Sequence, residues 1–225
     1  RERISPMAKP IPVYLEAGDK KVFACSIDFP GWCRSGRDEE AALEALADYA
    51  PRYAEVAELA KVAFPARVEL EVTERVKGKG ATDFGIPHEV TRADAEPLTA
   101  RQAARQVELM RAAWTVLDRV AKASPAELRK GPRGGGRDRD KMLDHVLGAE
   151  AAYARKLGIK HPQPELGDTR AIKALRDELA ETLRGASDGS PLVPNGWPPR
   201  YAIRRIAWHV LDHAWEMQDR ADPDG

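Results

Sequence analysis

Long hydrophobic runs and net charge are both missing from this chain of 225 residues. No stretch approaches the roughly 18 apolar residues that a membrane-spanning helix needs, and the N-terminus lacks the apolar segment of a signal peptide. We therefore expect a cytoplasmic protein with no membrane partner. The 36 Lys and Arg residues balance 36 Asp and Glu residues, so no excess charge attracts nucleic acid, and no nucleic-acid partner is expected.

Cysteine is scarce as well, with only Cys25 and Cys33 in the chain. Two cysteines are too few for a disulfide framework, and their spacing is not the CxxC of a redox or zinc motif. We therefore expect both thiols to be reduced.

The residues that are present divide the chain into two halves with different periodicity. In the first half, residues 11–29 alternate apolar and polar side chains on either side of Gly18-Asp19, which predicts a β-hairpin. A helical pattern begins near Asp38, and Pro51 must kink or split it. Residues 66–76 alternate again and predict a third strand. The predicted element is a small α+β domain of β-β-α-β order over residues 1–76.

The stretch from Phe23 to Leu46, FACSIDFPGWCRSGRDEEAALEAL, has a strand ending in a Pro-Gly turn, a loop of small residues, and a helix that opens with paired Glu. It resembles HicB-like antitoxin-type domains. The resemblance implies a small sheet with one helix packed on it. Such domains often bind a toxin partner or DNA through an added segment, but no helix-turn-helix pattern is evident here, so partner recognition and simple scaffolding both stay open.

Residues 77–98 are rich in Gly, Pro and charge and show no sustained period, which predicts a linker. His88 lies in it and is interpreted as a solvated loop histidine.

Four amphipathic helices are predicted after this linker, in segments 99–124, 137–158, 168–186 and 198–220. Thr99 suits an N-cap, and Pro198-Pro199 suits the first turn of the last helix. None of these helices can bury its apolar stripe alone, so we expect an all-α four-helix bundle over residues 99–225. The stripes consist of Ala103, Val107, Met110, Trp114, Leu117 and Ala121; Met142, Val146, Ala149 and Tyr153; Ile172, Leu175, Leu179 and Leu183; and Ala202, Ile206, Val210, Ala214 and Met217.

His209 and His213 lie one helical turn apart inside the last of these stripes. A buried imidazole needs a partner, because an unsatisfied polar group in an apolar setting costs about 1–3 kcal/mol. That partner is either a hydrogen-bonding group or a metal. His145 lies at the edge of the stripe of the second helix, so the three imidazoles can converge into a site with an open position. His161, followed by Pro162, is interpreted as a loop residue.

One His in the second helix followed by a small residue and Glu (His145, Ala149, Glu150), with HxxxH in the fourth (His209, His213), is similar to the pattern of the DinB/YfiT-like metalloenzyme family. The resemblance implies that His145, His209 and His213 hold a divalent metal. Zinc is the first expectation, and Ni, Mn and Fe stay open.

Characterised DinB-like relatives include isomerases and S-transferases that use mycothiol or bacillithiol, so the resemblance implies a low-molecular-weight thiol cofactor and an electrophilic substrate. The abundance of Ala, Arg, Gly and Pro resembles high-GC bacteria, for which mycothiol is the expected thiol. The alternative function is a non-catalytic binding protein, in which the HicB-like part recognises a partner and the bundle is a scaffold.

Three further residues are candidates for a role at this site. Glu216, one turn beyond His213, is a candidate base or partner of the histidines, or else a surface residue. Arg137 and Arg139, in the Gly- and Arg-rich stretch 128–141, are candidates for holding the thiol cofactor, against the alternative of a solvated linker.

The ridge of Trp208, Leu211 and Trp215 lies opposite the histidines on the same predicted helix. Large apolar groups on a face turned away from a core mark an interface. We therefore expect this ridge to pack on the N-terminal domain or on a second subunit, as in a homodimer.

Overall fold

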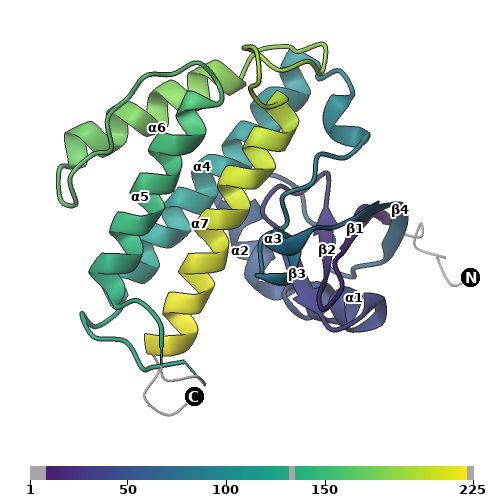
Figure 1. The fold of residues 1–225 in the computed structure, drawn as a ribbon, viewed down its shortest axis with the longest axis horizontal. Helices are drawn as coiled ribbons and strands as arrows, with labels where there is room; N and C mark the ends of the chain where they lie inside the picture. Colours follow the sequence, from purple (N-terminus) through teal and green to yellow (C-terminus); the bar gives the residue numbers. More distant parts are fainter. Residues whose placement is uncertain (1–8, 132–134, 222–225) are drawn as a thin grey trace, which may run out of the picture.

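A four-stranded sheet and four long helices lie side by side in the computed structural model, which describes residues 9–131 and 135–221 (Figure 1). The mixed class predicted from periodicity, with strands first and helices after them, is confirmed. The strands are β1 (Ile11–Ala17), β2 (Val22–Ser26), β3 (Cys33–Gly36) and β4 (Leu70–Lys77). The helices are α1 (Glu39–Asp48), α2 (Ala50–Leu59), α3 (Gly80–Asp83), α4 (Ala100–Ala123), α5 (Arg139–Arg155), α6 (Thr169–Leu183) and α7 (Pro199–Ala221), with a short 3₁₀ turn, η1, at Ala93–Ala95.

The sheet has the order β3-β2-β1-β4. Strands β1 and β2 form the antiparallel hairpin predicted around Gly18-Asp19, whereas β4 runs parallel to β1 after a crossover through α1 and α2. The expected single helix is split as Pro51 required, because α2 begins at Ala50 with the proline in its first turn. Strand β3 is an addition to the predicted β-β-α-β order, since the chain turns back at Gly31, where φ is +91°.

Cys25 and Cys33 are joined by a disulfide, so the prediction of two reduced thiols is wrong. They lie directly opposite each other on β2 and β3, with their Cα atoms 4.0 Å apart. The pairing depends on the register of β3, a strand that the sequence pattern did not reveal. Both side chains are buried beside Trp208 of α7.

Residues 77–98, expected as a linker, contain α3 and η1 and are bonded to both the sheet and α7. The carboxylate of Glu16 on β1, fully buried, accepts hydrogen bonds from the Thr82 hydroxyl at 2.7 Å and from the backbone N–H groups of His88 and Glu89 at 3.1 Å. Arg204 of α7 reaches the same stretch through the Asp94 carboxylate at 2.6 Å. Specific hydrogen bonds to β1 and an ion pair with α7 therefore hold this connection in place.

The four long helices pack in a ring, in which α4 and α5 each contact both α6 and α7 (Figure 1). Helix α4 begins as predicted, with the Thr99 side chain and Gln102 forming reciprocal hydrogen bonds at its N-terminus. Helix α7 begins at Pro199, also as predicted. No helix within the described ranges is both long and apolar enough to cross a membrane.

The tryptophan ridge of α7 packs on the N-terminal sheet and its helices, as expected from the sequence. Trp208 meets Phe23 of β2 edge to face at 6.4 Å between ring centroids, and Trp215 meets Tyr49 at 5.2 Å. Leu211, between them, is fully buried. One face of α7 is therefore covered by the sheet unit of the same chain, and the opposite face turns toward α5.

The Asp94–Arg204 pair supplies a test of this packing, because both side chains are almost fully buried, at 1% and 7% exposure. Asp94→Ala leaves a buried guanidinium without its carboxylate, so we expect it to lower the free energy of unfolding by about 3–5 kcal/mol in urea titrations. Asp94→Ala/Arg204→Met should recover part of that loss. Arg37→Ala, which removes an exposed ion pair, is the control and should change stability by at most about 0.5 kcal/mol. A loss below about 1 kcal/mol for Asp94→Ala would contradict the conclusion that Asp94 and Arg204 form a buried ion pair.

Candidate metal centre

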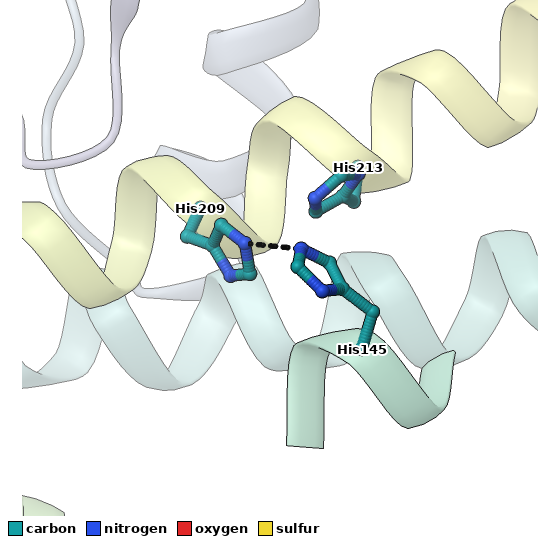
Figure 2. A group of neighbouring side chains, drawn as sticks. All are labelled: His145, His209 and His213. Atoms are coloured by element: carbon teal, nitrogen blue, oxygen red, sulfur yellow. Dashed lines mark hydrogen bonds between the residues drawn. The ribbon is translucent and has the colours of Figure 1, made fainter. Parts of the chain in front are cut away.

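Three histidines from two helices meet between α5 and α7 (Figure 2). His209 and His213 come from successive turns of α7, and His145 points toward them from α5. Each residue offers one ring nitrogen, and these nitrogens all lie within 4.8 Å of one another. The structure therefore brings together the three residues that the sequence proposed as metal ligands.

Helix packing accounts for this convergence. The i, i+4 spacing places His209 and His213 on the face of α7 that meets α5, opposite the tryptophan ridge. His209 is buried, whereas His145 and His213 keep partial exposure. Solvent therefore reaches two of the three rings, while the third closes the inner side of the site.

The spacing of one pair of ring nitrogens matches that of two ligands on a shared metal ion. The Nε2 atoms of His145 and His209 are 3.2 Å apart, and two nitrogens bound at about 2.0–2.1 Å to a tetrahedral zinc ion lie about 3.3 Å from each other. A hydrogen bond between two neutral imidazoles gives a similar distance. The ring of His213 lies edge to face with both of the others, with its centroid 4.7 Å from that of His209 and 5.0 Å from that of His145, so a third imidazole is close enough to share an ion with them.

Burial keeps two of these rings neutral, which is the ligand form of imidazole. Burial lowers the pKa of His209 well below its ordinary value, and the neighbouring His213 and His145 lower it further. The pKa of His145 is also lowered, first by burial and then by the charge of Arg137. The Nδ1 atom of His209 is buried without a hydrogen-bond partner among the described residues.

Glu216 contacts the His213 ring at its Nδ1 atom. Its Oε2 lies 3.2 Å from His213 Nδ1, and its Oε1 accepts a hydrogen bond from Arg220 at 2.9 Å. The hydrogen bond from His213 lowers the pKa of the Glu216 carboxyl below its ordinary value. A carboxylate on the remote nitrogen of a ligating histidine fixes the tautomer and the direction of the ring. This geometry favours the partner role over the base role, because a lowered pKa makes a carboxylate a weaker base.

The two candidate arginines lie in different surroundings. Arg137 is exposed, and its charge acts on both His145 and His209. Arg139 instead donates to the Ser124 carbonyl at 3.1 Å and to Asp140 at 2.8 Å, so its guanidinium is held at the end of α4. The stretch 128–141 that carries them includes residues 132–134, which lie outside the described residues.

Other residues singled out in the sequence are placed away from the nitrogens. Glu150 points to the opposite side of α5, where its carboxylate accepts from Trp114 at 2.8 Å and pairs with Arg176 at 3.2 Å. His161 is partly exposed and contacts the Pro162 carbonyl. His88 is half-buried beside Glu89, at 3.1 Å, rather than fully solvated. Tyr153 does approach the site, with its ring 5.9 Å from that of His209.

Arg220 is the residue of this region that the sequence analysis missed. Its signal was present as an i, i+4 pair with Glu216, but such pairs are common on solvated helix faces. Only the structure shows that Arg220 is buried.

Metal content is the direct test of this site. Protein purified without a His tag and supplied with zinc should hold one equivalent by elemental analysis, and His209→Ala and His213→Ala should each lose most of it, because two imidazoles bind far more weakly than three. His161→Ala, which removes a partly exposed histidine outside this cluster, should keep the full equivalent. Equal, near-zero metal in the wild type and His213→Ala would exclude the site.

Comparison of the chain with protein-family models, with curated proteins and with solved structures finds no match in any of the three.

Proposed function

We propose that this protein binds one divalent metal through His145, His209 and His213 and uses it in thiol chemistry, as an S-transferase or isomerase of the DinB/YfiT-like type. The single observation that carries the proposal is the three-imidazole cluster with two Nε2 atoms 3.2 Å apart. In this proposal the ring of α4 to α7 is the four-helix bundle of that family, and residues 1–76 are a HicB-like domain packed on its last helix.

The donor set suits a thiol ligand. Within the described residues, the cluster contains three imidazoles and no carboxylate. When bound, a divalent cation held by neutral imidazoles keeps its full charge and lowers the pKa of a thiol that ligates it. The partial exposure of His145 and His213 leaves an approach for that thiol from solvent.

The surrounding residues have separate tasks in this proposal. Arg137 is exposed, its charge acts on His145 and His209, and it binds an anionic or polar part of the thiol cofactor. Glu216 orients His213 through the contact of its Oε2 with the ring Nδ1 at 3.2 Å. Arg139, which bonds to Ser124 and Asp140, belongs to the support of the loop rather than to the ligand.

The reaction needs no further reactant. The thiol sulfur forms a bond to an electrophilic carbon, an activated double bond gives its π pair to the adjacent carbon, and that carbon takes up the proton that the thiol released. The product is an adduct in a transferase. In an isomerase, rotation about the carbon–carbon bond that was the double bond, followed by loss of the same thiol sulfur and of a proton from the adjacent carbon, returns the alkene with the other geometry.

A structural metal in a non-catalytic binding protein is the second candidate, favoured by the burial of His209 in the middle of α7. The two candidates differ in the consequence of metal removal. A structural ion is lost together with the fold, whereas a catalytic ion exchanges from a folded protein. Circular dichroism and thermal melting during chelation separate these cases.

The thiol proposal is tested with the zinc-loaded protein, mycothiol and simple electrophiles such as a maleyl compound or chlorobimane. The wild type should accelerate conjugation above the buffer rate, and His209→Ala should abolish the acceleration. Arg137→Ala should raise the KM for the thiol more than it lowers kcat, because it removes binding to a part of the cofactor that does not react.

Arg139→Ala is the matched control, since it removes a guanidinium two residues away that bonds to the protein itself. It should leave the KM for the thiol unchanged. If the wild type and His209→Ala both react at the buffer rate, and calorimetry detects no thiol binding to the metal-loaded protein, the binding-protein alternative replaces the enzyme.

A further inference from the structure

Arg220, in the last turns of α7, is a buried cation with three acceptors from three places in the chain. Its side chain is 8% exposed. Nη1 donates to Glu216 Oε1 and to the Arg137 carbonyl, both at 2.9 Å, and Nε donates to the Arg129 carbonyl at 2.7 Å. A planar guanidinium can serve such divergent acceptors at once, whereas an ammonium group is a single point charge.

The connection between α4 and α5 is fitted to this side chain. The backbone N–H of Arg129 donates to the Arg220 carbonyl at 3.0 Å. Gly136 lies against the guanidinium with φ at +116°, and a Cβ atom there would fall 2.7 Å from its Cζ. Both the missing side chain and the left-handed backbone of Gly136 thus allow the connection to close over Arg220.

These contacts extend without a break to the metal centre. Arg220 holds one oxygen of Glu216, and the other oxygen of the same carboxylate lies 3.2 Å from His213 Nδ1. The backbone of Arg137, whose charge acts on His145 and His209, is held by the same guanidinium. The Arg220 side chain therefore both fixes the direction of a candidate ligand and anchors the backbone of Arg129 and Arg137.

We infer that Arg220 is a positioning residue for the three-histidine centre and that it makes metal binding and anchoring of the α4–α5 connection depend on each other. The inference rests on the metal site proposed above. A fixed Glu216 holds the His213 ring with its other nitrogen toward His145 and His209, so less ordering of side chains remains when an ion binds. By linkage, an ion that needs this arrangement also strengthens the contacts that produce it.

Simple electrostatics predicts the opposite effect of removing Arg220 on zinc affinity. Removing a positive charge from the neighbourhood of a dication should tighten its binding. If Arg220 acts by position, Arg220→Met should instead weaken zinc binding, by the roughly 10- to 100-fold that loss of an outer partner of a ligand typically causes. Arg220→Lys keeps the charge but loses the divergent donors, so it should weaken binding as well. A charge effect alone would leave Arg220→Lys like the wild type.

The experiment measures zinc affinity of the full chain by competition with a fluorescent chelator, for the wild type, Arg220→Met, Arg220→Lys, Glu216→Ala and Glu216→Ala/Arg220→Met. Because both residues act through His213, the double variant should bind zinc no more weakly than Glu216→Ala alone. Arg52→Met is the matched control: it removes the Arg52–Asp219 ion pair at the same end of α7 without touching Glu216, and its zinc affinity should equal that of the wild type.

Hydrogen exchange gives a second readout that does not depend on activity. Zinc should slow amide exchange in residues 128–131 and 135–140 of the wild type and of Arg52→Met, and should leave it unchanged in both Arg220 variants. Should Arg220→Met fail to fold, Arg220→Lys and Glu216→Ala carry the same comparison.

The three possible negative results overturn different parts of the inference. A wild type that binds no zinc overturns the metal centre together with this inference. Zinc binding by the wild type, with Arg220→Met binding as tightly or more tightly, overturns only the role of Arg220. Wild-type exchange that is insensitive to zinc overturns the coupling to the connection.

Discussion

The burial of α7 on opposite faces is the constraint on which the rest of the structure depends. Every residue from Pro199 to Leu211 is buried. The tryptophan ridge on one face meets the sheet and α1–α2 region, and the histidine face meets α5. A single helix thus belongs to two packing layers, and a continuous core of buried side chains runs from the strands through α7 into α4, α5 and α6.

Such burial is costly for the charged residues that α7 carries, and their bonds shape the irregular segments of the chain. Arg204 reaches Asp94, Arg205 reaches the Pro87 carbonyl, and Arg220 reaches the Arg129 and Arg137 carbonyls. Because a buried guanidinium needs acceptors, the two connections rich in glycine and charge are drawn onto the helix. Segments without periodicity are placed here by buried cations rather than by their own propensity.

The same burial prepares the histidine cluster. Desolvation disfavours the charged imidazolium, so His209 and His145 are held in the neutral state in which their nitrogens can act as ligands. The three imidazole rings lie within reach of one another, and the Glu216–Arg220 pair directs one of them from outside. The site and the fold are therefore stabilised by the same helix.

The sequence by itself predicted the local elements and singled out the three histidines as residues that could converge. Periodicity located the hairpin, the split at Pro51 and the four long helices, because side chains on one face of an element repeat at fixed intervals. The i, i+4 spacing of His209 and His213 placed both rings on one face, and the ordering of helices brought His145 opposite them. The tertiary structure alone decided the short strand β3, the Cys25–Cys33 pairing and the burial of Arg220. These depend on strand register and on which distant backbone carbonyls lie near a given side chain, and neither leaves a repeating pattern in the residues themselves.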